Sequence, residues 1–366
     1  MTRVIARLVV AVTTLALLAG CSAAAPGGEA RSTAATSGAS ATPGAAGAAL
    51  VDPRTITGPS TAAPVTDIAP IAGTAKPALP VTLTDATGAS VTVSDASRVL
   101  ALDIYGTLAE TVVGLGLGDR LVGRGSSNTL QVMKDLPVVT RNGHELNGEA
   151  VLALRPTLVL TDTTIGPREV QDQLRSSGVT VVFFDPKRSI DAIGPQIGAV
   201  AHALGLDALG EKLAKRTADE LASAKADIAR LAPADESKRL RLAFLYARGT
   251  AGVFFLFGKG MGADALIPAL GAVDVASTAG ITGAKPAGSE ALLATNPDAF
   301  LMMSDGLAST GGVDGLLKRP GVADTLAGQH RRVVDMNDGQ ILSFGPSTPA
   351  VLRSRADALY RPGARG

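Results

Sequence analysis

Two hydrophobic patterns alternate along most of the chain. Short apolar runs of strand length occur at 98–102, 157–161, 179–184, 240–248 and 299–303. Longer segments with a helical pattern occur at 106–116, 149–154, 168–176, 190–204 and 263–270. Regular alternation of strands and helices is typical of parallel α/β layers. The sequence therefore predicts an α/β fold, which opens with a hairpin formed by residues 81–84 and 89–93.

One segment, residues 207–232, breaks this alternation. It has no Gly after Gly210 and no Pro, and it is rich in Ala, Leu, Lys and Glu. A helix of this length would be about 35 Å long, enough to cross a whole domain. We therefore predict two Rossmann-like α/β lobes, at 81–206 and 233–366, joined by one long helix.

A short motif occurs once in each predicted lobe. Residues 149–156 (EAVLALRP) and 290–297 (EALLATNP) share Glu, Ala, Leu, Ala and Pro in the same order. Five identities in eight residues could arise by chance in an Ala-rich chain. However, each motif has the same order of helix, Pro and apolar strand. This shared context favours two related halves.

The N-terminal residues have the pattern of an export signal. Arg3 and Arg7 precede an apolar run at 8–20, which is too short for a comfortable membrane span. The run ends in Leu-Ala-Gly-Cys21, which resembles a bacterial lipobox. An ordinary signal peptide with an incidental Cys is the alternative. We expect residues 1–20 to be removed and Cys21 to carry lipid, which anchors the protein on the extracellular face of the cell membrane.

The segment after Cys21 has a low-complexity composition. Residues 22–49 consist largely of Ala, Gly, Ser, Thr and Pro, with Glu29 and Arg31 as the only charges. Such a segment cannot bury enough apolar surface to offset its ordering entropy. We therefore expect a disordered tether over 21–80.

Composition excludes several functions. The chain has 34 Lys and Arg against 33 Asp and Glu, so a nucleic-acid partner is not expected. A single Cys excludes an internal disulfide or a CxxC site, and three His are too few for a zinc cluster. There is no Gly-x-Ser-x-Gly element, and Gly258–Gly262 lacks a Walker ending. The expectation is a binding protein that is not an enzyme.

Two places carry candidate ligands. His144 lies in the loop 141–147, between a predicted strand and helix, where open α/β sheets line their ligand crevice. Strand alternation places Tyr246 and Arg248 on one face, where the strand reaches Gly249. A cation lowers the pKa of a neighbouring phenol, and Tyr is a known axial haem ligand. Taken alone, a loop His is more often a hydrogen-bonded surface residue than a ligand.

This plan resembles the helical-backbone, class III substrate-binding proteins that feed ABC importers of iron-siderophores, cobalamin or haem. The resemblance covers roughly residues 81–366. In that class, an acidic residue at the start of the motif helix in each lobe docks onto permease Arg residues. The matching positions are Glu149 and Glu290. Stabilisation of the helix N-terminus by Glu is a compatible alternative.

Two motifs narrow the resemblance to the haem-binding members of Gram-positive bacteria, especially actinobacteria. Gly143–Asn147 reads Gly-His-Glu-Leu-Asn, and Tyr246–Gly249 reads Tyr-Ala-Arg-Gly. The resemblance implies that His144 and Tyr246 are the axial ligands of ferric haem (hemin) in the inter-lobe cleft. It also implies that Arg248 hydrogen-bonds the Tyr oxygen.

The expected function is therefore capture of haem at the membrane and delivery to an ABC permease and its ATPase for iron uptake. A ferric siderophore or cobalamin is the alternative ligand, with His144 and Tyr246 merely lining the pocket. Whether surface haem-donor proteins supply the haem stays open. Whether Tyr105, Met302 or Met303 line the pocket also stays open.

Overall fold

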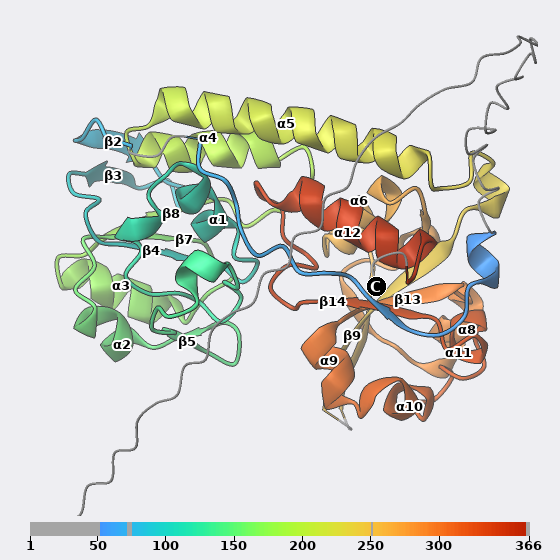
Figure 1. Cartoon of the computed structure of the whole chain (residues 1–366). Coiled ribbons are helices and arrows are strands. Elements are labelled where there is room, and N and C mark those ends of the chain that lie inside the picture. The colour runs from blue at the N-terminus through green and yellow to red at the C-terminus, as the bar shows by residue number, and fades with distance from the viewer. Residues whose placement is uncertain (1–51, 72–74, 250–251, 364–366) are drawn as a thin grey trace, which may run out of the picture. The chain divides into compact units, whose positions relative to one another are not determined.

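The computed structural model of the chain describes residues 52–71, 75–249 and 252–363 (Figure 1). They belong to one compact unit, which covers residues 49–366. The predicted signal peptide and Cys21 lie outside the described residues. Within the described ranges, no helix is both long and apolar enough to cross a membrane.

The N-terminal lobe is built on a parallel sheet with the strand order β4-β7-β8. These strands span Val99–Leu102, Leu158–Thr161 and Thr180–Phe183. Almost every position in them is buried, as expected for parallel strands covered on both faces. The helices of this lobe are α1 (Thr107–Gly114), α2 (Gly148–Ala153), α3 (Arg168–Ser176) and α4 (Ile193–Ala203). Two hairpins complete it, β2–β3 (Val81–Thr84, Ser90–Val93) and β5–β6 (Thr140–Arg141, Glu145–Leu146).

The long connecting helix is α5, which spans Asp207–Ala229 and has 23 residues. It packs against α4, where a Cβ on Gly210 would lie only 2.4 Å from the Cβ of Ala201. The C-terminal helix α12 (Thr348–Tyr360) also packs on α5 (Figure 1). Arg353 Nε donates to Asp227 Oδ2 at 2.9 Å across this contact.

The C-terminal lobe contains a mixed sheet with the order β1-β14-β13-β9-β10-β12, with β11 also paired to β9. The strands span Ser60–Thr61 (β1), Arg241–Arg248 (β9), Val253–Phe257 (β10), Val273–Asp274 (β11), Ala284–Pro286 (β12), Ala299–Met303 (β13) and Val333–Met336 (β14). The shorter helices of this lobe are α6 (Ala263–Ala269), α7 (Val275–Thr278), α8 (Ser289–Thr295), α9 (Ser304–Ser309), α10 (Gly312–Leu317) and α11 (Leu326–Gln329). β13 is parallel to both β9 and β14. The predicted α/β class is confirmed.

Part of the expected tether is ordered, which corrects the prediction for residues 52–71 and 75–80. β1 pairs in parallel with β14 through Ser60↔Val334, so it extends the C-terminal sheet. The buried Arg332 donates to Gly58 O at 3.1 Å and to Ser60 Oγ at 2.9 Å. Ala62 is also buried. The segment is ordered because a sheet edge and a buried guanidinium form hydrogen bonds with it, although its own side chains are small.

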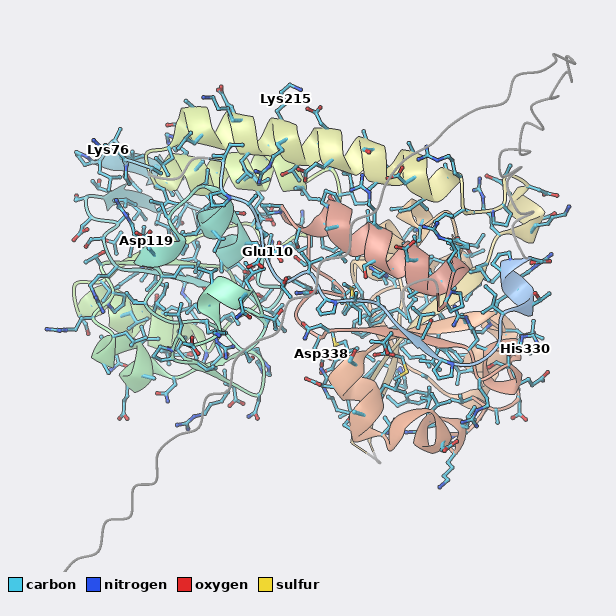
Figure 2. The ribbon with its side chains drawn as sticks, in the orientation of Figure 1. Lys76, Glu110, Asp119, Lys215, His330 and Asp338 are labelled. Atoms are coloured by element: carbon cyan, nitrogen blue, oxygen red, sulfur yellow. The ribbon has the colours of Figure 1, made fainter. Side chains whose placement is uncertain are left out.

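A buried carboxyl links the two lobes. Glu110 of α1 is 5% exposed and lies near the centre of the view in Figure 2. It accepts hydrogen bonds from Ser343 Oγ at 3.0 Å and Ser347 Oγ at 2.7 Å, both just before α12. Burial raises the pKa of Glu110 to about 7, although these hydrogen bonds oppose the shift.

This pKa predicts a pH-dependent stability. The unfolded carboxyl ionises near its ordinary pKa of 4.5, so stability is lost as the pH rises from there through about 7. The loss amounts to about 3 kcal/mol when complete. We expect Glu110→Gln to gain stability relative to the wild type as the pH is raised from 5 to about 8, measured by denaturant unfolding. Glu211→Gln, on the exposed face of α5, is the control; a gain of the same size there, or no pH trend for Glu110→Gln, contradicts the prediction.

Candidate functional site

His144 lies at the tip of the β5–β6 hairpin. Asn142 and Gly143 adopt positive φ angles of 50° and 83°, a turn that Asn-Gly permits at little cost. The imidazole is exposed, and its Nδ1 lies 3.0 Å from Asn142 O. A carbonyl can only accept, so a hydrogen bond of this kind requires the proton on Nδ1. The neutral ring then keeps a free lone pair on Nε2, which is the form that binds a metal.

The same hairpin leads directly into the helix that carries Glu149. Gly166 N donates to His144 O at 2.9 Å, which ties the hairpin to the loop before α3. Asn147 Oδ1 accepts from Ala150 N at 3.2 Å and caps α2. Glu149 is exposed in the first turn of this helix. His144 and Glu149 both line a pocket of about 750 Å³. The predicted iron-binding residue and the predicted docking carboxylate therefore lie in the same part of the N-terminal lobe.

Tyr246 lies near the end of β9 in a row of aromatic rings. Phe257 of β10 stacks on Phe244 with ring centroids 5.1 Å apart and on Tyr246 with centroids 5.5 Å apart. Phe244 is buried, whereas Tyr246 is half-buried. Strand alternation thus places the two β9 rings on one face, and cross-strand stacking fixes the tyrosine ring.

Arg248 covers the face of the tyrosine ring. Its Cζ atom lies 4.8 Å from the ring centroid of Tyr246. Its Nη2 donates to Asp338 Oδ2 at 2.6 Å and to Met303 Sδ at 3.3 Å. Within the described residues, Arg248 makes no hydrogen bond to the Tyr246 oxygen, which differs from the contact implied by the resemblance. The guanidinium lies over the ring and pairs with Asp338 instead.

Asp338 is the residue of this site that the sequence reasoning missed. It lies 90 positions from Arg248, in the loop that follows β14. β9, β13 and β14 are parallel neighbours, so the ends of these strands meet at one edge of the sheet. No local pattern marks Asp338, because its partner Arg248 lies 90 positions away in the sequence.

Tyr105, Met302 and Met303, for which the sequence did not decide whether they line the pocket, occupy different environments. Met303 is half-buried beside Arg248, as described above, but Met302 is fully buried on the other side of the sheet. Tyr105, at the end of β4, is half-buried with Arg188 Cζ 5.5 Å from its ring centroid. Burial raises the pKa of Tyr105. Met302 is therefore a core residue, whereas Met303 and Tyr105 retain exposed surface.

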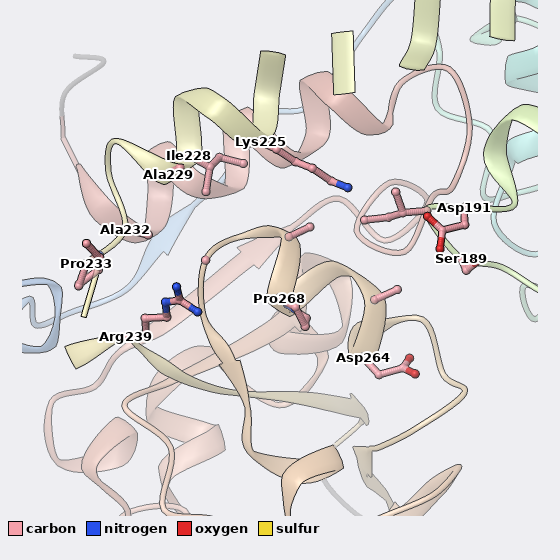
Figure 3. A pocket seen from close by; sticks show the side chains of 15 residues that line it. Ser189, Asp191, Lys225, Ile228, Ala229, Ala232, Pro233, Arg239, Asp264 and Pro268 are labelled. Carbon is pink, nitrogen blue, oxygen red and sulfur yellow. The ribbon is translucent and has the colours of Figure 1, made fainter. Parts of the chain in front are cut away.

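The predicted site residues are not all brought together. No hydrogen bond or ring contact joins His144 to Tyr246 in the part of the chain that the structure describes; they belong to different lobes. Glu290 is exposed in the first turn of α8, as Glu149 is in α2. A further pocket of about 810 Å³ lies between α5 and α6 and is lined by Lys225, Arg239 and Asp264 (Figure 3). It contains none of the predicted site residues.

Two α/β lobes joined by one long helix, each presenting candidate ligands on a loop or strand end, define a class of binding proteins. The chain belongs to the periplasmic binding protein family, whose pattern it matches over residues 104–338. The predicted family is therefore confirmed. A search of curated proteins found no match.

Solved structures of haem-binding proteins are similar to this chain. The haem-binding protein HmuT is 50% identical, with 85% of this chain and 100% of that chain covered and a TM-score of 0.82. Variants of HmuT with one His, one Tyr or one Arg replaced by Ala have also been solved. RhuT from Roseiflexus sp. RS-1, a periplasmic haem-binding protein in apo form, is 37% identical over 73% of this chain and 98% of that chain, with a TM-score of 0.66. BhuT in complex with two haems is 33% identical over 72% of this chain and 98% of that chain, with a TM-score of 0.62.

Proposed function

We propose that this protein binds ferric haem, with His144 and Tyr246 as the two axial ligands, and delivers it to an ABC importer. The observation that carries the proposal is the pair of donors, an exposed imidazole whose Nδ1 lies 3.0 Å from a carbonyl oxygen in one lobe and a ring-anchored phenol in the other. The chain that carries these donors is 50% identical to a haem-binding protein over most of its length. The matched proteins are binding proteins, so the role is transport and not catalysis.

The chemistry of the two donors suits ferric haem. A phenol oxygen is a hard donor that binds ferric iron as phenolate, and an imidazole nitrogen is the most common haem ligand. The Arg248 guanidinium supplies positive charge beside the ring on which a phenolate would carry negative charge. Met303, which is half-buried beside Arg248, adds apolar surface. This surface suits a flat porphyrin.

Anchoring and delivery complete the proposal. Lipid on Cys21 would hold the protein on the extracellular face of the cell membrane, where haem arrives from solution or from a surface donor protein. Glu149 and Glu290 would dock onto the permease through charge-assisted pairs, one from each lobe. Both carboxylates are exposed, as such a role requires.

A hemin titration followed by absorbance tests the ligand and the role of His144 together. The wild-type protein should develop a Soret band, and His144→Ala should shift that band and lower the affinity because the iron loses one axial ligand. His202→Ala is the matched control. His202 is also exposed, but its Nδ1 is engaged by Asp207 at 2.8 Å.

Three outcomes separate the alternatives. An unchanged spectrum and affinity for His144→Ala would remove that residue from the iron. An equal effect of His202→Ala would show that the change is not specific to the site. Absence of hemin binding, together with binding of a ferric siderophore or cobalamin, would replace haem as the ligand.

A further inference from the structure

Asp338 makes the shortest polar contact of Arg248, at 2.6 Å against 3.3 Å for those to Met303 Sδ and Ala247 O. Both of its carboxylate oxygens are engaged, Oδ2 by Arg248 Nη2 at 2.6 Å and Oδ1 by Asp305 N at 2.8 Å. The side chain is 21% exposed and that of Arg248 is 35% exposed, so the pair is partly shielded from water. A partly shielded, charge-assisted pair with a second anchor on the carboxylate has a defined geometry.

This geometry determines where the positive charge lies. With Nη2 held by Asp338 and by Met303 Sδ, the guanidinium carbon remains 4.8 Å from the Tyr246 ring centroid. Without the carboxylate, the long arginine side chain would be free to turn toward solvent, and ordering it again would cost conformational entropy. The carboxylate thus fixes the arginine before any ligand binds.

Asp338 also lies on a segment that reaches the N-terminal lobe (Figure 2). Its neighbour Gly339 packs against that lobe so closely that an added Cβ would lie 2.0 Å from Ser127 O. Asn337, which precedes Asp338, accepts a hydrogen bond at its Oδ1 from Thr129 Oγ1 at 3.3 Å. Ser126 N in turn donates to Thr140 Oγ1 at 2.9 Å, at the start of the hairpin that carries His144. A continuous series of contacts therefore runs from the Asp338 segment to the His144 hairpin.

We infer that Asp338 is a positioning residue of the haem site, which holds Arg248 over Tyr246 so that the C-terminal ligand is arranged before haem binds. The inference rests on the proposed function, because it assigns Asp338 a role toward the proposed iron ligand. It adds a residue that does not touch the iron and acts only through Arg248.

The test compares Asp338→Asn with Arg248→Ala in hemin titrations of the full chain. Asp338→Asn keeps the side-chain shape and removes the charge. We expect a loss of hemin affinity of about 10- to 100-fold, the usual effect of removing a partner of a metal ligand. The ferric haem spectrum should shift in the same direction as that of Arg248→Ala. Asp314→Asn, which removes an exposed carboxylate paired with Arg331 at 2.6 Å, should leave affinity and spectrum unchanged.

A double variant separates positioning from general loss of structure. If Asp338 acts through Arg248, Asp338→Asn combined with Arg248→Ala should bind hemin no more weakly than Arg248→Ala alone. Additive losses would overturn the inference, as would a wild-type spectrum and affinity for Asp338→Asn. Asp338→Glu, which keeps the charge, should bind hemin more tightly than Asp338→Asn. Tighter binding by Asp338→Ala than by Asp338→Asn would contradict the role.

The failure of this inference differs from the failure of the proposed function. If Tyr246→Ala shifts the spectrum and Asp338→Asn does not, only the positioning role is wrong. If Tyr246→Ala also leaves the spectrum unchanged, tyrosine is not an iron ligand and the proposed function itself must be revised.

Discussion

Tyr246→Phe is expected to lower hemin affinity by more than the roughly 10- to 100-fold typical of a partner of a metal ligand, because it removes the iron-binding atom itself. The substitution deletes only the phenol oxygen. The ring, stacked 5.5 Å from Phe257, and the guanidinium above it can remain in place. The loss therefore measures the oxygen–iron bond and not the packing. Absorbance titration with hemin gives both the affinity and the change of axial ligand.

Two further variants make this result specific. Tyr246→Ala removes the ring as well, so any additional loss beyond Tyr246→Phe reports the contribution of ring stacking. Tyr360→Phe is the control, since Tyr360 is buried and donates to Leu270 O at 2.7 Å, away from the site. Hemin affinity and a Soret band equal to the wild type for Tyr246→Phe would refute the assignment of this residue to iron.

A large loss of haem uptake is expected for the double variant Glu149→Ala with Glu290→Ala. Removing both carboxylates should strongly impair haem uptake in cells or reconstituted vesicles, since losing one partner of a buried charge pair costs about 2–5 kcal/mol at an interface. Hemin affinity of the isolated protein should change far less than uptake does, because neither carboxylate is a proposed iron ligand. The comparison of uptake with binding isolates the docking step.

Matched first-turn acids separate docking from helix stabilisation. Glu169 lies in the first turn of α3 and Asp314 in that of α10, and both are exposed. A helix N-terminus favours an acidic residue by about 0.3–1 kcal/mol wherever it occurs. Glu169→Ala with Asp314→Ala should therefore cost similar stability but leave uptake intact. Equal uptake by the two double variants would eliminate the docking role.

Much of the secondary structure was predictable because its signals are local. The predicted bounds of α3 (Arg168–Ser176) and β13 (Ala299–Met303) are those observed. The hydrophobic pattern that indicates each element lies within the segment itself. The long helix was also predicted, and it ends at Ala229, three residues before the predicted end. These elements depend mainly on their own side chains. Neighbours far along the chain did not need to be known.

Residues 52–71 and 75–80 were expected to belong to a disordered tether, but they are ordered. Their composition has few large apolar side chains, so nothing local indicates order. Ser60 and Thr61 are ordered because β14 offers a sheet edge 274 positions away. A strand this short depends on its partner, and the sequence does not show which partner is free.

The sequence by itself determined the α/β class and the connecting helix, because both follow from periodicity, which belongs to short segments. His144 and Tyr246 stay predicted iron ligands, which the sequence indicates through its resemblance to haem-binding proteins. Only the tertiary structure showed that Asp338 holds Arg248 over the tyrosine ring, and that Glu110 is buried against Ser343 and Ser347. Those contacts join positions 90 and more than 230 residues apart. The physical reason is that burial and ion pairing arise when strands and helices pack, and no short stretch of sequence contains them.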